Sequence, residues 1–232
     1  MIRLPFFTLI FSIVCVNFIT AQDFNQTDEQ GKRHGPWKKF YPGSQQLRYK
    51  GTFDHGQEVG TFSFYSLESK NQAVATKTYT PGSTLIDVTY FTNEGNIISK
   101  GQMEGRQKVG RWTYYHPDGK TIMTIEQYKA GVLEGQRKVF FPNSQLAQRQ
   151  GYKNGKEEGL DEHFAENGTR LKIFNFKQGR LEGPSKIWNV DGELLVEGQY
   201  KDNKKHGIWK YYKNGKLDRE VRFPQNKIGV NH

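Results

Sequence analysis

Histidine, cysteine and carboxylate side chains are the groups in this chain that could bind a metal ion or move protons. The chain has 6 His and 1 Cys. His34 and His206 each precede a glycine at equivalent points of a repeat, where other copies place Val59, Val109, Glu134, Glu158 or Glu182. So varied a position indicates turn surface rather than a metal ligand, and His55, His116 and His163 occupy other positions. No zinc-type cluster containing cysteine can be drawn, so we predict no metal and no cofactor.

Carboxylates gather in one stretch of the chain, at Glu157, Glu158, Asp161, Glu162 and Glu166. Paired carboxylates could hydrolyse glycosides or bind calcium. We interpret them instead as a solvated acidic face of a basic protein. The sequence has no glycine-rich phosphate loop leading into a helix and no nucleophile elbow. We therefore predict no catalytic residue and no enzymatic activity.

Composition limits the class of protein that could position such residues. The 232 residues are 34% hydrophobic and 14% aromatic, with 25 Gly and 8 Pro. Disordered chains are usually poor in aromatics, so a disordered chain is not expected here. A large aliphatic core, as in a doubly wound α/β enzyme, is not expected from so few hydrophobic residues.

The first 21 residues have the three parts of a secretory signal: Arg3, an apolar run over 4–19, and a small-residue exit at Ala21. The run is shorter than the roughly 20 residues that span a bilayer. We expect cleavage after Ala21, with a retained anchor or a lipoprotein at Cys15 as alternatives. Cleavage removes the only Cys and lowers the net charge from +10 to 34 − 1 − 24 = +9. We expect an exported protein in the periplasm, at the cell surface or outside the cell, with no later transmembrane segment.

One motif repeats through most of the remaining chain. Glycines recur every 24–25 residues, at Gly35, Gly60, Gly110, Gly135, Gly159, Gly183 and Gly207, and Leu85 fills the gap, so we count eight copies. Five residues after each of these positions stands an aromatic, which we predict to be the repeat core: Phe40, Tyr65, Tyr90, Tyr115, Phe140, Phe164, Trp188 and Tyr212. The domains are then a signal at 1–21, a lead at 22–30, the array at 31–223 and a tail at 224–232.

A second column lies later in each copy, at Phe53, Tyr79, Met103, Tyr128, Tyr152, Phe176, Tyr200 and Phe223. Between the columns stand turn pairs such as Asp118-Gly119 and Asn214-Gly215, which favour type I′ hairpin turns. A 24-residue copy holds two short strands and two turns but no ordinary helix. We predict an all-β fold, an elongated antiparallel meander of about sixteen strands, with a looser loop around 66–83. A lone copy buries too little to fold, so neighbouring copies must stack.

Trp37, Phe62, Trp112 and Trp209 lie three residues before the first column. Residues three apart on a regular strand face opposite sides of the sheet. Either both faces carry aromatics, or a β-bulge realigns them.

The stretches 207–217, GIWKYYKNGKL, and 110–119, GRWTYYHPDG, resemble MORN-type repeats in their bacterial variant form, some of which are labelled antitoxin-like. The resemblance covers 31–223. It implies a row of β-hairpins in one twisted sheet, a scaffolding, protein-binding or phospholipid-binding role, and no catalysis. The export signal argues against an antitoxin role. A second resemblance is to aromatic cell-wall-binding repeats, which hold choline by cation–π attraction.

Basic residues gather in the first and last copies. They include Lys32, Arg33, Lys38, Lys39, Lys204, Lys205 and Lys210. They could be solubilising end caps or could bind an anionic partner such as phospholipid or lipopolysaccharide. The leading hypothesis is an exported scaffold with a protein partner. The alternatives are an anionic-surface binder and a cell-wall glycan or choline binder using exposed Trp37, Trp112 and Trp209; nucleic acid is not expected.

Overall fold

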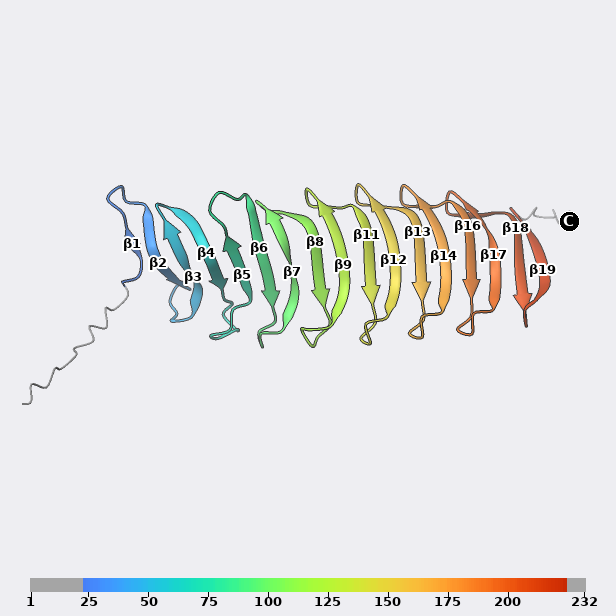
Figure 1. The fold of residues 1–232 in the computed structure, drawn as a ribbon, viewed down its shortest axis with the longest axis horizontal. Coiled ribbons are helices and arrows are strands. Elements are labelled where there is room, and N and C mark those ends of the chain that lie inside the picture. Colours follow the sequence, from blue (N-terminus) through green and yellow to red (C-terminus); the bar gives the residue numbers. More distant parts are fainter. Residues whose placement is uncertain (1–22, 225–232) are drawn as a thin grey trace, which may run out of the picture.

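The computed structural model describes residues 23–224, so the predicted signal at 1–21 and all of the tail after Pro224 lie outside the described residues. The chain forms an elongated ribbon of strands that run across its long axis (Figure 1). The first nine strands are β1 Gln26–Thr27, β2 Arg33–Phe40, β3 Leu47–Asp54, β4 Gln57–Phe64, β5 Ala75–Tyr79, β6 Leu85–Phe91, β7 Ile97–Glu104, β8 Gln107–Tyr115 and β9 Ile122–Lys129. The others are β10 Val132–Leu133, β11 Gly135–Phe140, β12 Leu146–Lys153, β13 Lys156–Phe164, β14 Arg170–Lys177, β15 Arg180–Leu181, β16 Gly183–Trp188, β17 Leu194–Lys201, β18 Lys204–Lys213 and β19 Lys216–Phe223.

Pairing follows chain order throughout and is always antiparallel. The strands β10 and β11 both pair with β9, and β15 and β16 both pair with β14, because Glu134 and Glu182 interrupt what would be single strands. These two divisions and β1 account for the difference between 19 strands and the expected sixteen. The predicted all-β meander is confirmed, and residues 23–224 contain no helix.

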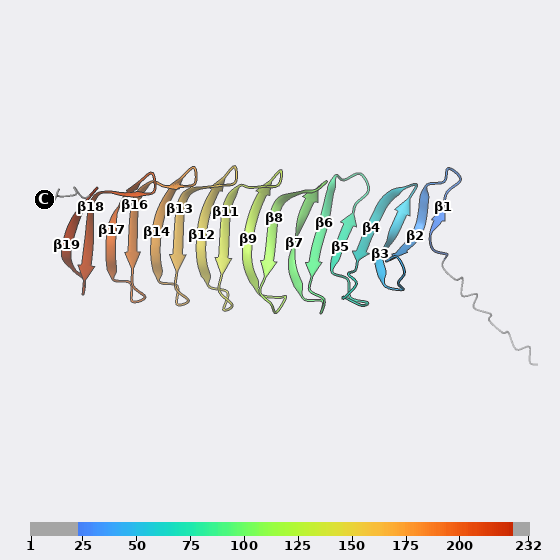
Figure 2. The ribbon, with the colours of Figure 1, turned by 180° about the vertical axis from the view of Figure 1, so that it is seen from behind.

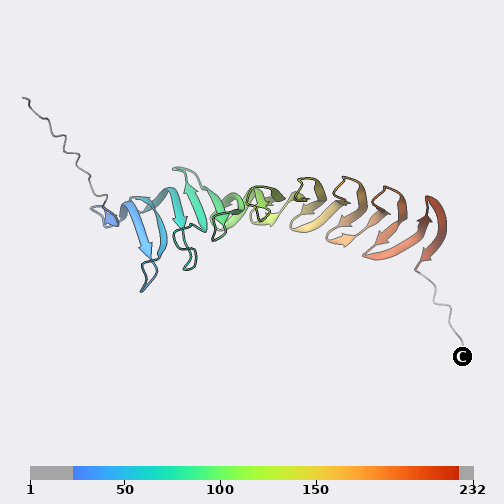
Figure 3. The same ribbon diagram turned by 90° about the horizontal axis from the view of Figure 1, so that it is seen from below.

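The sheet is a single layer. Within residues 23–224 nothing packs across either broad face (Figures 1 and 2). The hairpins are curved and the array twists along its length (Figure 3), as right-handed strand twist requires. Aromatic rings can then be buried only against neighbours on the same face, so the core runs lengthwise along the sheet.

Turns within a copy close one edge of the ribbon. At Asn214-Gly215 both residues have positive φ, 51° and 69°, as the type I′ prediction requires. The prediction is wrong at the other turn pairs of this kind, including Asp118-Gly119, because only their second residue is left-handed. The N–H of that residue donates to the carbonyl three residues earlier, which is the His116 carbonyl for Gly119.

At three of these turn pairs, the side chain at the first position accepts backbone N–H groups and favours the different turn. The Asp118 carboxylate accepts from Lys120 and Thr121, and Asn143 and Asn167 accept in the same way. The hydrogen bond from the Thr121 hydroxyl, and then the two backbone bonds, lower the pKa of Asp118 to about 2.

Turns between copies close the opposite edge and join each copy to the next. The carboxylate of Glu134 accepts a hydrogen bond from the N–H of Asn154 at 2.8 Å. Glu158 and Glu182 receive equivalent bonds from Gln178 and Asp202. The side chain before the leading glycine therefore connects one inter-copy turn to the next. The variety of residues at this position in the sequence did not predict that role.

The predicted core column is buried less than expected. Phe40 is 45% exposed, Tyr65 is buried, and the other six members are half-buried. Phe62, Trp112 and Trp209, in the column three residues earlier, are buried more deeply, and so is Phe53 of the second column. Trp112 contacts Tyr114, whereas Tyr115 lines a groove with Arg111 and Thr113. Both faces therefore carry aromatics.

The degenerate stretch is longer than a standard turn but well held. Residues 65–74 form the loop, and β5 follows within the region expected to be loose. Ser69 is buried, and Ser66 and Ser69 exchange hydrogen bonds between their N–H groups and hydroxyls at 3.0 Å.

Candidate functional site

Three buried rings, those of Phe62, Trp112 and Trp209, each lie against a glycine of the preceding strand. A Cβ added to Gly101 would lie 2.5 Å from the Trp112 ring, and a Cβ on Gly198 would lie 2.3 Å from Trp209. Trp112 Nε1 donates to the carbonyl of Gln102 at 2.9 Å. We call the side of the sheet that carries these rings the tryptophan face.

Lysine side chains close this face over the rings. Lys108 Nζ lies 4.6 Å from the Trp112 ring centre and 5.1 Å from the centres of Tyr114 and Tyr128. Lys205 makes the same arrangement with Trp209. Trp112 is 0% exposed and Trp209 2%, so the expectation of exposed tryptophans is wrong for both, and Trp37 is half-buried. The aromatic rings that could have bound choline by cation–π attraction therefore form cages around ammonium groups of the chain itself, those of Lys108 and Lys205.

The middle of the tryptophan face is polar. Arg137 takes the Trp112 position in its copy, and its Nε donates to Glu126 at 3.3 Å. In the next copy this position is Asp161, which accepts hydrogen bonds from Gln148 at 2.7 Å and His163 at 3.0 Å. Burial first, and then hydrogen bonds to Tyr128 and Glu126, raise the pKa of Tyr114 beside this segment.

The expectation of a solvated acidic face is wrong for two members of the carboxylate cluster, Asp161 and Glu162, whereas Glu166 is exposed. Asp161 is 6% exposed and Glu162 3%, and they point to opposite sides of the strand. Glu162 pairs with Arg149 at 2.5 Å and with Arg170 at 3.1 Å. Both carboxylates are therefore engaged in contacts within the sheet.

The opposite side, which we call the groove face, carries a row of shallow grooves. One of them, about 460 Å³, is lined by residues that include Lys100, Arg111, Tyr115 and Ile122. Equivalent grooves of about 330 and 200 Å³ lie beside Leu160 and Ile208. Leu160 and Ile208 are exposed. This face combines apolar and charged side chains at intervals set by the repeat.

The predicted basic residues divide into two groups at opposite ends of the ribbon (Figure 1). Several are occupied within the protein: the Arg33 guanidinium lies 4.2 Å from the Phe53 ring centre, Lys38 Nζ lies 3.6 Å from that of Phe24, and Lys205 fills a cage. Lys210 lies 4.0 Å from Glu220. Lys32, Lys39 and Lys204 are exposed and form no ion pair within residues 23–224.

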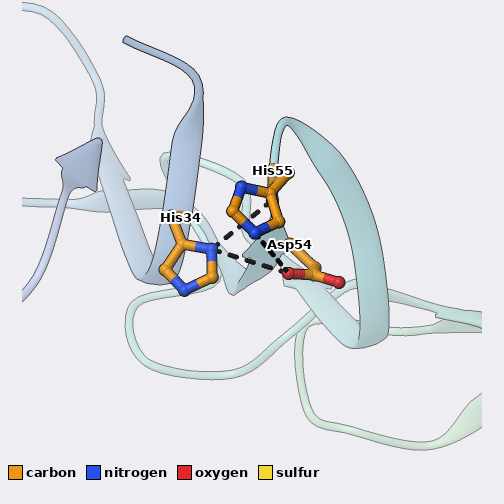
Figure 4. Close-up of side chains that lie close together, drawn as sticks. All are labelled: His34, Asp54 and His55. Carbon is orange, nitrogen blue, oxygen red and sulfur yellow. Dashed lines mark hydrogen bonds and ion pairs between the residues drawn. The ribbon is translucent and has the colours of Figure 1, made fainter. Parts of the chain in front are cut away.

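A cluster of possible metal ligands lies at the edge between the first two copies. One ligand atom from each of His34, Asp54 and His55 lies within 4.8 Å of the others (Figure 4). His34 Nδ1 is 3.6 Å and His55 Nε2 3.9 Å from Asp54 Oδ1. The sequence analysis did not predict this cluster, because His34 and His55 occupy different repeat positions. The signal that could have indicated it is that His34 and the inter-copy turn at 54–56 lie at the same edge of the sheet.

Comparisons with known proteins agree with this architecture. Residues 108–130, 133–154 and 205–223 match the family model described as MORN repeat variant. The predicted resemblance to MORN-type repeats is confirmed for these three segments. In general, MORN repeats are non-enzymatic modules that interact with proteins or membranes. The part of the chain that the structure describes has no helix long and apolar enough to cross a membrane.

Two solved structures resemble this chain weakly. They are "Crystal Structure of TcdB2-TccC3-Cdc42" and "Crystal Structure of TcdB2-TccC3", at 14% and 13% identity and a TM-score of 0.21 each. Each match covers 83% of this chain and 13% of the solved chain. No curated protein matches. A likeness of this size carries no argument about the fold or the function.

Proposed function

We propose that this protein is an exported, non-enzymatic scaffold that binds a partner protein along the groove face. The observation that carries the proposal is the row of grooves at repeat spacing on a face that nothing covers within residues 23–224. The tryptophan face is a poorer candidate, because Lys108 and Lys205 already cover its rings.

The groove chemistry suits a protein partner. Lys100 and Arg111 lie beside Tyr115 and Ile122 in the groove of about 460 Å³, so apolar contact and charge pairing are available together. Protein interfaces combine an apolar, aromatic centre with a polar rim in this way. The grooves are too open to enclose a small ligand on most sides, as small-molecule sites do.

Export is part of the proposal and is supported by the charged start, the apolar run and the small-residue exit of 1–21. Cell fractionation should find the protein outside the cytoplasm, with Gln22 as its first residue. A cytoplasmic protein that keeps Met1 would refute export.

Partner binding is tested by capturing proteins from the envelope fraction with purified wild-type protein and variants. Arg111→Glu and Ile208→Asp alter two separate grooves and should each weaken capture of the same partner. Lys213→Glu, at an exposed position beside a turn, is the matched charge-reversal control. Capture that survives both groove variants, or that Lys213→Glu weakens equally, would refute the groove face as the binding surface.

A second candidate is an anionic lipid surface, favoured by the exposed lysines Lys32, Lys39 and Lys204. Each contributes about 1 kcal/mol near an anionic leaflet, or about fivefold in affinity. Lys39→Glu and Lys204→Glu should reduce sedimentation with phosphatidylglycerol vesicles at low salt, whereas Lys120→Glu in the middle of the array should not. Sedimentation that ignores salt would exclude this candidate. Lys205 is unsuitable for the test because its removal empties an aromatic cage.

A further inference from the structure

The first inter-copy turn carries residues that the later turns lack. Its sequence is Asp54-His55-Gly56, whereas 129–131, 153–155 and 177–179 each begin with lysine and have no histidine. His34 stands where later copies place the turn-tying glutamates Glu134 and Glu158. Three positions therefore differ at one point of the sheet edge. Asp54 stands in place of a lysine, His34 in place of a glutamate and His55 in place of another turn residue, and each side chain is a potential metal ligand.

The atoms that converge there are hydrogen-bond acceptors. His34 Nδ1 accepts a long hydrogen bond, 3.4 Å, from the N–H of His55. His55 Nδ1 lies 2.6 Å from Asp28 Oδ2, so it carries the proton and leaves Nε2 as a lone pair. That lone pair faces Asp54 Oδ1 at 3.9 Å. Two imidazole nitrogens and a carboxylate oxygen thus face one point, an arrangement that a cation would stabilise.

Asp28 holds the His55 ring in place from outside the cluster. Its other oxygen, Oδ1, accepts hydrogen bonds from the N–H groups of Gln30 and Lys32 at 3.0 and 2.9 Å. The Asp28 side chain is only 8% exposed. A carboxylate that accepts the second ring N–H of a histidine is the usual outer partner in metal sites, because it fixes the tautomer and the ring orientation.

The geometry is close to that of a metal site. Metal–ligand bonds of about 2.0–2.2 Å place tetrahedral ligands about 3.4 Å apart. The separations to Asp54 Oδ1 are 3.6 and 3.9 Å, and all three ligand atoms lie within 4.8 Å of one another (Figure 4). Because the three side chains are exposed, small rotations can close the triad and leave a fourth position for water.

We propose that His34, Asp54 and His55 form a binding site for one divalent transition-metal ion, with Asp28 as the positioning residue. Two imidazoles and one carboxylate suit Zn²⁺ and its neighbours rather than Mg²⁺ or Ca²⁺, which prefer all-oxygen sites. The site does not depend on the partner-binding role.

The test is calorimetric titration of the untagged protein with ZnCl₂ at neutral pH. Wild type should bind one Zn²⁺ per chain. His34→Val, the residue that two other copies carry at this position, should abolish saturable binding. His55→Asn should do the same, and it should still fold because Asn154 adopts the same left-handed conformation in the equivalent turn. Asp28→Asn should keep one site but weaken it about 10–100-fold.

His206→Val is the matched control, because His206 holds the His34 position in the last copy, pairs across the sheet with Gln199, and is followed by no Asp-His pair. It should leave the titration unchanged, and circular dichroism should show every variant folded. With Co²⁺, wild type should show tetrahedral visible absorption that His55→Asn lacks. No Zn²⁺ binding by wild type, binding that survives His34→Val and His55→Asn, or equal loss in His206→Val would overturn the proposal.

Discussion

Replacing Gly101 with alanine tests whether the array is held together by rings lying on glycines. The new Cβ would lie 2.5 Å from Trp112 Cδ2 and 2.6 Å from Cε2, whereas ordinary contacts begin near 3.4 Å. The ring must therefore retreat by almost an ångström. Such a shift removes it from the Gln102 carbonyl, which its Nε1 now reaches at 2.9 Å, and disturbs its stacking on Tyr90.

The expected cost follows from these contacts. Overpacking a filled site costs about 1–3 kcal/mol, and the lost indole hydrogen bond adds about 1 kcal/mol. Alanine reduces the entropy of the unfolded chain and returns about 0.5 kcal/mol. Gly101→Ala should therefore lower the free energy of unfolding by about 2.5 kcal/mol.

A double-mutant cycle with Trp112→Ala isolates the cause. Trp112→Ala alone should cost about 3–5 kcal/mol, but in that background Gly101→Ala should be neutral or slightly stabilising, because no ring remains to clash. Urea unfolding followed by circular dichroism gives the free energies, and amide hydrogen exchange shows whether the loss is confined to β7 and β8. If Gly101→Ala costs the same with and without the ring, the ring-on-glycine explanation is refuted.

Three further outcomes follow from the described contacts. Phe40→Ala should cost under about 1 kcal/mol and Tyr65→Ala about 3 kcal/mol, since only Tyr65 is buried; equal urea midpoints would contradict this. Glu162→Gln should cost about 2 kcal/mol because it weakens two arginine contacts, and the loss should disappear in an Arg149→Ala, Arg170→Ala background. The pKa of Asp118 is lowered from 3.8 to about 2, so its stabilising effect is present above pH 4 and is lost as pH falls toward 2; acid titrations of wild type and Asp118→Asn should converge there.

Periodicity predicted the fold because its cause is local. Eight copies, two strands in each and a turn at each end follow from where glycines and aromatics recur, and the structure keeps that order. The choice of core column failed because every copy has an aromatic at the Tyr115 position but only four have one at the Trp112 position. Burial depends on the partner strand as well as on residue type. The sequence did contain a signal for the buried column, because a glycine that leaves room for a ring stands two residues before a second-column residue. These glycines are Gly51, Gly101 and Gly198.

The candidate metal site was missed for a related reason. Spacing along the chain put His34 and His55 in different repeat positions, and variety at the His34 position was interpreted as an absence of constraint. In a meander, residues on either side of one hairpin meet at the same edge. Asp28 lies beside them because the two-residue strand β1 pairs with β2. That pairing is outside the repeat, so the periodicity of the sequence does not indicate it.

Matched side chains across adjacent strands explain how one layer stays folded without a second. Phe62, Trp112 and Trp209 lie on glycines, whereas Arg137 meets the carboxylate of Glu126. Asp161 pairs in register with the amide residue Gln150. Each copy is therefore fitted to the strand before it, so the copies are not interchangeable. Because these contacts engage the side chains of the tryptophan face, exposed positions of the groove face such as Arg111 and Ile208 can vary at little cost to the fold.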